Sequence, residues 1–171
     1  LNDEKIAVLR AHRVSRVSMG VQSIFANETA AVQRRQRQKE VEQALIALSS
    51  AVAIRNVDLI YGLPGQTSQT LRASIDRVLE LGANELYLYP LYVRPLTILS
   101  RHRAHGDQRI GLYRDARDYL LGRGFRQVSM RMFAAADHPG DGTSAPTYRC
   151  QDDGMVGLGP GARSYTRSLH Y

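Results

Sequence analysis

The sequence is poor in cysteine, tryptophan and long apolar runs. It contains one cysteine, Cys150, and no tryptophan among 171 residues. A single cysteine cannot form a disulfide within the chain, which is typical of a reducing compartment, and we expect a cytoplasmic protein. Five scattered histidines and one cysteine show no metal-ligand spacing, so these residues predict no metal site. No apolar run approaches the ~20 residues of a membrane-spanning helix, and we expect no membrane association.

Lysine is also scarce, although the chain is basic. The net charge is +7, and Lys5 and Lys39 are the only lysines. Arginine is densest at 34–37, and a second basic cluster with two histidines lies at 101–105. A basic protein can bind nucleic acid or an anionic ligand. However, aromatic residues make up only 7% of the chain and do not alternate with basic ones as stacking platforms require, so we expect no nucleic-acid partner.

One stretch, residues 56–67, organises the chain. An apolar run that includes Asp58 predicts a buried strand, and glycine and proline residues at 62–65 end it. Thr67 or Ser68 can cap the helix that follows, which has four apolar residues at helical spacing: Leu71, Ile75, Val78 and Leu79. Asp58 needs a partner if it is buried. From the sequence alone it is either a ligand contact or a capping or turn acid.

The same reading along the chain predicts alternating helices and strands. The predicted helices are 4–13 with Ile6 and Leu9 inward, a short one capped by Asn27, 38–50, 71–81, and one that buries Ile110, Tyr113, Ala116 and Leu120. The predicted strands are 16–22, the Asp58 strand, 86–92, 127–133 and a brief one at 155–158; 97–107 and 134–147 are predicted loops.

This order predicts an α/β fold with a mostly parallel sheet, similar to about half of a (β/α) barrel. Ligands of such folds bind at the carboxyl ends of the strands. We therefore expect Gln22, Asp58 and Tyr92 to end neighbouring parallel strands and to line one cleft. Half a barrel has open edge strands, so we also expect the chain alone to form homo-oligomers, exchange elements or be marginally stable.

Three motifs carry a family resemblance. They are Ser18-Met19-Gly20-Val21-Gln22-Ser23, Val57-Asp58-Leu59-Ile60-Tyr61-Gly62-Leu63-Pro64-Gly65-Gln66-Thr67 and Gly157-Leu158-Gly159-Pro160-Gly161-Ala162-Arg163-Ser164-Tyr165. In this order, they resemble the later part of the oxygen-independent coproporphyrinogen III oxidase-like radical S-adenosylmethionine (SAM) enzymes, over essentially the whole chain. The resemblance implies a partial (β/α) barrel of the radical SAM type, with 1–133 as its C-terminal half and 134–171 as a family-specific extension.

The resemblance also implies cofactors and their contacts. SAM and a 4Fe-4S cluster lie at the carboxyl ends of the strands in this family, and reduction of the cluster cleaves SAM to a 5′-deoxyadenosyl radical. Six residues match positions near SAM, with Arg34 facing its carboxylate and Arg163 facing a second SAM: Gln22, Arg34, Asp58, Ile60, Tyr92 and Arg163. An arginine can bind a carboxylate through two parallel hydrogen bonds, which suits that role.

The chain departs from the family pattern in two respects. It lacks the Cys-x3-Cys-x2-Cys cluster motif, and Cys150 lies near the other end. We expect this motif upstream, in a longer protein of which the chain is an inactive fragment lacking the N-terminal strands. Arg131-Met132-Phe133-Ala134 stands where members carry Ser-Asn-Phe-Ala, and Tyr148-Arg149 begins the segment where a His-Asn pair is usual. The likeness is therefore to an uncharacterised bacterial branch, with the substrate open.

Three functions are compatible with these residues. The first is a radical SAM oxidoreductase that acts on an unknown small-molecule substrate and takes electrons from a donor such as flavodoxin or ferredoxin. The second is a haem-binding or haem-delivery protein of the same family without oxidase activity. The third is a sugar- or phosphate-binding (β/α) barrel, which leaves Gln22, Arg34 and Asp58 unexplained.

Overall fold

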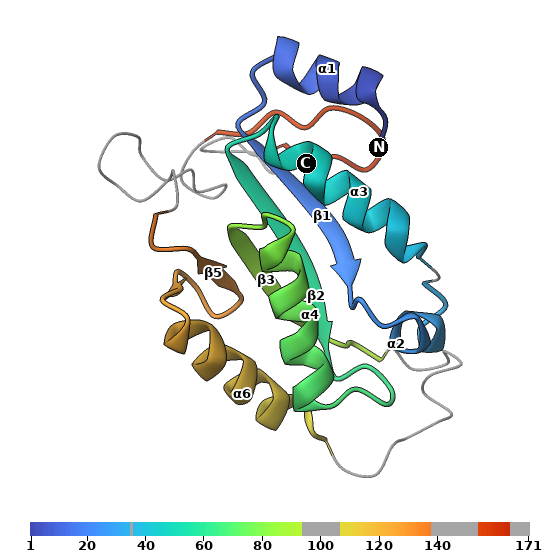
Figure 1. Ribbon diagram of the computed structural model, residues 1–171, viewed down its shortest axis with the longest axis vertical. Coiled ribbons are helices and arrows are strands. Elements are labelled where there is room, and N and C mark those ends of the chain that lie inside the picture. Colours follow the sequence, from blue (N-terminus) through green and yellow to red (C-terminus); the bar gives the residue numbers. More distant parts are fainter. Residues whose placement is uncertain (35, 94–106, 138–153, 165–171) are drawn as a thin grey trace. The chain divides into compact units, whose positions relative to one another are not determined.

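The computed structural model describes residues 1–34, 36–93, 107–137 and 154–164. The chain forms two compact units, 1–139 and 140–171. Cys150, the basic cluster at 101–105 and most of the two predicted loops lie outside the described residues. The first unit contains the helices and strands of Figure 1: α1 (Asp3–Ala11), β1 (Arg16–Gln22), α2 (Ala26–Ala31), α3 (Gln38–Ser49), β2 (Ile54–Tyr61), α4 (Ser68–Glu80), β3 (Glu85–Pro90), α6 (Arg109–Gly122), β4 (Arg126–Gln127) and β5 (Met132–Ala134).

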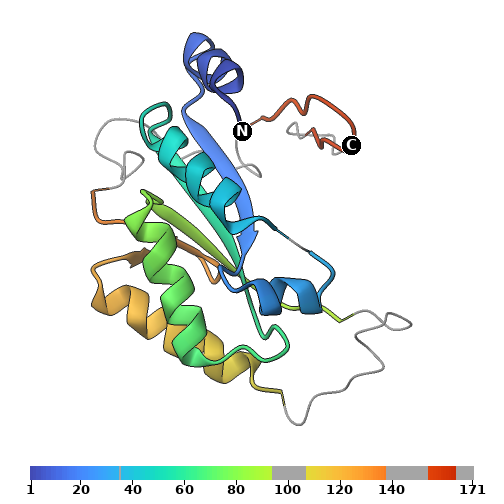
Figure 2. The same cartoon turned by 45° about the vertical axis from the view of Figure 1, so that its right-hand side comes forward.

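The five strands of the first unit form one sheet. Their order is β1-β2-β3-β5-β4. The strands β1, β2 and β3 are parallel, whereas β5 runs antiparallel to β3 and β4 antiparallel to β5. Helices α3, α4 and α6 all pack on one face of this sheet (Figures 1 and 2). This arrangement confirms the predicted α/β fold with a mostly parallel sheet.

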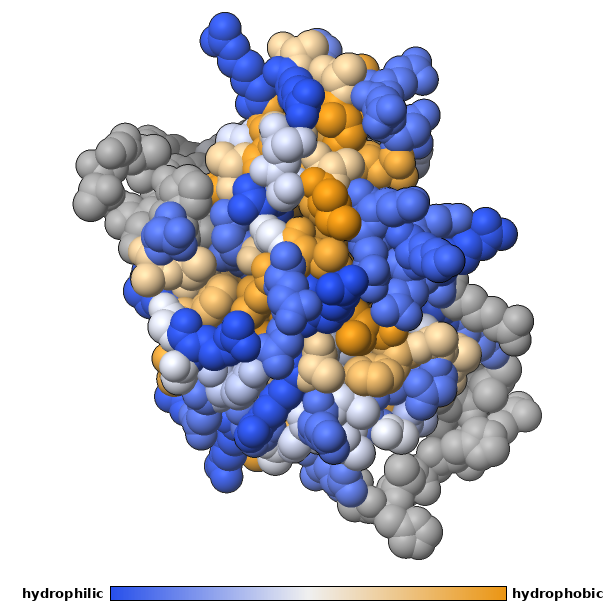
Figure 3. Space-filling model, viewed as in Figure 1, coloured by the Kyte–Doolittle hydropathy of each residue, from blue (hydrophilic) through white to orange (hydrophobic). Residues whose placement is uncertain are grey.

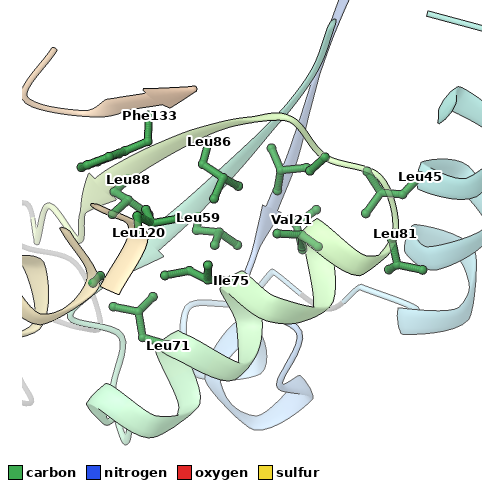
Figure 4. Close-up of a cluster of buried hydrophobic side chains, with 14 of the residues drawn as sticks. Val21, Leu45, Leu59, Leu71, Ile75, Leu81, Leu86, Leu88, Leu120 and Phe133 are labelled. Atoms are coloured by element: carbon green, nitrogen blue, oxygen red, sulfur yellow. The ribbon is translucent and has the colours of Figure 1, made fainter. Parts of the chain in front are cut away.

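The core lies between that face and the helices. Alternate residues of the central strands, such as Val57 and Leu59 in β2 and Leu86 and Leu88 in β3, are fully buried. Figure 4 shows Leu59, Leu86 and Leu88 of these strands beside buried residues of α4 such as Leu71 and Ile75. Burial of one such side chain stabilises the fold by roughly 1.5–3 kcal/mol, so the packing fixes which residues of each strand face away from the helices.

Helix α4 begins and ends as the sequence predicts. The Thr67 hydroxyl accepts a hydrogen bond from the backbone N–H of Thr70 at 3.2 Å, and the Thr70 hydroxyl accepts one from the N–H of Thr67 at 3.0 Å. This reciprocal cap satisfies two backbone donors that a helix start leaves free. Gly82 follows the helix with φ +96°, a conformation that suits glycine.

Two helix predictions are wrong in detail. Phe25, not Asn27, is the N-cap residue of α2, and Asn27 lies within the helix. Ile110 is 63% exposed, because α6 buries Leu112, Ala116 and Leu120 instead. Those three residues are spaced by four, so Ile110 lies on the opposite side of α6 from Leu112.

The predicted strand 127–133 is a short hairpin instead. Strands β4 and β5 pair antiparallel, and the Ser129 hydroxyl accepts hydrogen bonds from the N–H groups of Arg131 and Met132 in the connecting turn. Met130 lies in this turn and is 71% exposed, so residues 127–133 do not form one continuous buried strand. The hairpin closes the parallel part of the sheet with antiparallel strands.

The described part of the second unit, 154–164, is a glycine-rich turn. The predicted strand 155–158 is reduced to a single bridged residue, Met155. The N–H of Gly157 donates to the Ser164 hydroxyl at 3.0 Å, and Gly159 and Gly161 have φ values of +101° and +75°. The glycines therefore serve a tight turn rather than a strand.

Candidate functional site

The sheet face opposite the helices is polar. Residues that alternate with the buried core positions share this polar face: Arg16, Ser18, Gly20, Asn56, Asp58, Ile60, Glu85, Tyr87 and Tyr89. Because β1, β2 and β3 are parallel, residues in register on them lie side by side. This face carries Asp58 and, at the end of β1, Gln22.

Gln22 is held by a bulge at the end of β1. Gly20 pairs with Asp58, but Gln22 pairs with Leu59, so one extra residue of β1 is accommodated between them. Gln22 has φ +67° and is only 7% exposed. Its Nε2 lies 2.7 Å from the point that a Cβ on Gly20 would occupy. The amide therefore folds back over Gly20, on the face that carries Asp58, and requires a glycine there.

Asp58 lies in the middle of β2 and not at its end. Its Oδ1 accepts a hydrogen bond of 2.7 Å from Nδ2 of Asn56. Burial raises the pKa of the Asp58 carboxyl above its ordinary value, although the Asn56 bond acts in the opposite direction. Its place within a strand excludes the capping or turn role, and it contradicts the expectation that Asp58 ends its strand.

An ion pair between Arg16 and the buried Glu85 lies on the same face of the sheet. Arg16 of β1 donates through Nε and Nη2 to Oε1 of Glu85 on β3, and Glu85 is 1% exposed. Oδ1 of Asn56 is buried without a hydrogen-bond partner in the described part of the chain. This buried acceptor lies on the same strand face as Asp58.

A second buried network joins the ends of β1 and β2. The Ser23 hydroxyl donates to Oε2 of Glu28 at 2.6 Å, and Nε2 of Gln66 donates to the same oxygen at 3.2 Å. Gln66 Nε2 also donates to the Ile60 carbonyl at 3.0 Å, and Gln66 Oε1 accepts from the N–H of Gly62 at 2.7 Å. The network thereby fixes the loops that follow Gln22 and Tyr61. Sequence reasoning missed both this network and the Arg16–Glu85 pair.

The segment that carries Arg34 is tied to the end of β1. Gln36 Nε2 donates to the Gly20 carbonyl at 2.9 Å, and the backbone N–H of Arg34 donates to the Thr29 carbonyl at 2.9 Å. Gln33, directly before it, has φ +58°. Arg34 itself is exposed. The backbone thus passes close to Gly20 and leaves the Arg34 side chain accessible.

The other three predicted residues occupy different settings. The Ile60 carbonyl is bound by Gln66, and its side chain lies on the polar face. Tyr92 follows β3 by two residues and is 64% exposed, so it does not end the strand as expected. Arg163 is exposed in the second unit. The structure therefore brings Gln22 and Asp58 together on adjacent strands of one face.

The helix side of the sheet carries two further hollows among the described residues, one of them lined by polar groups of α4 and α6 such as Arg72, Asp76 and Tyr119. Figure 3, in the view of Figure 1, shows hydrophilic residues with apolar areas between them. A shallow pocket between α2, α3 and α4 is lined largely by apolar side chains such as Val21, Ile24, Val41 and Leu45. Its polar lining residues are Ser23, Thr29, Gln36, Gln38 and Glu42.

Within the described ranges, no group of three or more His, Cys, Asp or Glu side chains could hold a metal ion. None of the described helices is long and apolar enough to cross a membrane.

Comparisons with known proteins show relatives of two kinds. No family model matches the chain. It is 27% identical to the heme chaperone HemW of Lactococcus lactis over 180 residues, which covers 100% of the chain and 46% of that protein. It is 29% identical to HemW of Bacillus subtilis over 174 residues, covering 96% of the chain and 45% of the relative. It is 30% identical to the oxygen-independent coproporphyrinogen III oxidase of Escherichia coli over 138 residues, which covers 75% of this chain and 30% of that protein.

A solved structure shares the fold. Coproporphyrinogen III oxidase (HemN) from Escherichia coli, described as a radical SAM enzyme, superposes with a TM-score of 0.75 at 24% identity. The match covers 96% of this chain and 42% of that one. The chain thus spans less than half the length of these relatives.

Proposed function

We propose that this chain, whose homologues are radical SAM proteins of the HemN and HemW type, provides SAM contacts on the polar face of its sheet. The main observation that supports this proposal is the placement of Gln22 and Asp58. They lie on adjacent strands of one face, and the Gln22 amide is held over Gly20 by a bulge. In this proposal, residues 1–133 are the C-terminal half of the barrel and 134–171 are an extension of it.

The residues on this face fit the chemistry of SAM. SAM presents an amine, ribose hydroxyls and a carboxylate, which need both acceptors and donors. Among the described residues, Asp58 is hydrogen-bonded only through Oδ1, to Asn56, which leaves the second carboxylate oxygen as an acceptor, and Gln22 supplies an amide. These groups are preorganised by the sheet, so binding requires little reordering of side chains.

Arg34 is assigned to the SAM carboxylate. The Gln36–Gly20 hydrogen bond keeps its segment beside the end of β1, where the Gln22 amide lies. An exposed guanidinium at this place can bind a carboxylate through two parallel hydrogen bonds. Ile60 and Tyr92 are proposed as packing contacts of the same cofactor, and Arg163 as a contact of a second SAM.

The reaction belongs to the bound cofactors. When bound, SAM and a reduced 4Fe-4S cluster would supply a radical for hydrogen abstraction from a small-molecule substrate, and flavodoxin or ferredoxin would be a suitable electron donor. This chain's residues bind and orient SAM, while the helices exclude water from the opposite face of the sheet. The cluster's cysteine ligands are proposed to lie outside this sequence.

A heme-handling function is the second candidate. The HemW heme chaperones match 96–100% of the chain, whereas the E. coli oxidase matches 75% of it. In this alternative the same face holds SAM, but the protein binds heme and delivers it without oxidation of a porphyrinogen.

The two functions are separated by product analysis. The full-length protein, reconstituted with iron and sulfide and reduced by dithionite, should form 5′-deoxyadenosine from SAM. Coproporphyrinogen conversion in the same assay supports the oxidase; tight heme binding without conversion supports the chaperone. Absence of both SAM binding and 5′-deoxyadenosine would contradict the proposal.

A further inference from the structure

Arg131 is a cation held in place by tyrosines at the carboxyl end of β3. Its guanidinium carbon lies 5.4 Å from the centre of the Tyr89 ring, and Nη2 donates to the Tyr92 hydroxyl at 3.0 Å. The Tyr89 ring stacks on that of Tyr87, with centroids 5.9 Å apart and an angle of 19°. Since Tyr87 and Tyr89 lie on the polar face, Arg131 extends from the β4–β5 hairpin over the same face as Asp58.

The charge of Arg131 has no close carboxylate in the described part of the chain. The ion pairs found there involve other arginines: Arg16, Arg37, Arg72, Arg77, Arg109, Arg117 and Arg123. Burial raises the pKa of Tyr89, so its phenol is neutral at physiological pH. The carboxylate of Asp58 also raises the pKa of Tyr89. However, Asp58 lies opposite Tyr87 and not Tyr89 in the sheet, and its carboxylate accepts a hydrogen bond from Asn56.

We propose that Arg131, Tyr89 and Tyr92 bind a carboxylate group of a ligand on the polar face. This inference rests on the proposed function, since it adds a contact to the same ligand-binding face. A guanidinium oriented by a ring and a phenol keeps donors free for two parallel hydrogen bonds to a carboxylate. Tyr92, 64% exposed, adds a hydroxyl that can donate to the same anion.

The carboxylate can come from two sources, a flat substrate with acidic side chains or SAM itself. The position of Arg131 favours the substrate. The Gln36–Gly20 bond ties the Arg34 segment to β1, whereas Arg131 contacts the tyrosines of β3 and the segment after it. Since β2 lies between β1 and β3, the two arginines are on opposite sides of the three parallel strands.

The test uses the reconstituted full-length protein and three probes. They are SAM, hemin with its two carboxylates, and hemin dimethyl ester, in which both carboxylates are esterified and carry no charge. The variant is Arg131→Gln, and the matched control is Arg114→Gln, an exposed arginine of α6. Calorimetry measures SAM affinity, and absorbance titration measures the affinities for both hemins. Thermal unfolding followed by circular dichroism checks that each variant is folded.

We expect Arg131→Gln to weaken hemin binding about 10- to 100-fold, the effect of losing one charge-assisted pair, and to leave the ester and SAM unchanged. A similar loss for SAM alone would support the carboxylate site and assign it to SAM. Unchanged affinities for both SAM and hemin, including a wild type that binds no hemin, would overturn the inference. A wild type that binds no SAM would instead contradict the proposed function.

Discussion

Gly20→Ala should change the SAM affinity that depends on Gln22 while it leaves the free energy of unfolding almost unchanged. A Cβ at position 20 would come within 2.7 Å of Gln22 Nε2, closer than such atoms approach. The contact involves the far end of a flexible side chain, so the amide can move away while the backbone stays. Gly20 has no positive φ, so alanine brings no backbone strain.

The magnitude follows from the single contact displaced. A hydrogen bond between Gln22 and SAM is worth about 0.5–1.5 kcal/mol, so its loss lowers SAM affinity about two- to ten-fold. Stability should change by less than about 1 kcal/mol, because alanine reduces the entropy of the unfolded chain by a similar amount to the cost of moving the amide. Gly111→Ala is the control, since a Cβ there meets nothing within 4 Å.

Calorimetry with SAM and urea denaturation measure the two effects separately. The double variant Gly20→Ala/Gln22→Ala should bind SAM no more weakly than Gln22→Ala alone, since both changes remove the same contact. Full additivity of the two losses, or a Gly20→Ala variant with wild-type SAM affinity, would refute this reasoning.

Three further predictions concern other parts of the site and sheet. Arg34→Ala should weaken SAM binding about 10- to 100-fold, whereas Arg37→Ala should change it little, because the Arg37 side chain is 85% exposed. Equal small effects of both variants in calorimetry would contradict a contact between Arg34 and SAM. Because the folded-state pKa of Asp58 is raised above 3.8, its ionisation opposes folding as pH rises through that raised value, so Asp58→Asn should be more stable than wild type at pH 7 and lose this advantage towards pH 4 in urea denaturation. The edge strand β1 should make the isolated chain dimerise or exchange elements, and a monodisperse, stable monomer by light scattering would count against this.

Local patterns account for most of what the sequence predicts correctly. The apolar run around Asp58 predicts the buried strand that contains Leu59, and Thr67 was one of the two predicted caps of the next helix. These features depend on local sequence alone. The sequence predicted one strand over 127–133, whereas exposed Met130 lies in a turn within it, so the hairpin was missed.

The site could be predicted only in part because its contacts are long-range. The Arg16–Glu85 pair joins residues 69 apart and the Glu28–Gln66 bond joins residues 38 apart, and both depend on the strand order. Polar residues just after strand ends, such as Ser23 and Gln66, were the available signal for the second network. No sequence rule places a glutamine at φ +67°, so the fold of Gln22 over Gly20 required the structure.

The most direct measurement of the central claim is the SAM affinity of the reconstituted full-length protein carrying Gln22→Ala and Asp58→Asn together. The control is Gln43→Ala on the exposed side of α3. If SAM binds on the polar face, the double variant should lose at least about five-fold in affinity, since each removed hydrogen bond is worth about 0.5–1.5 kcal/mol, while the control binds like wild type. Wild-type affinity in a folded double variant would contradict a SAM site on this face.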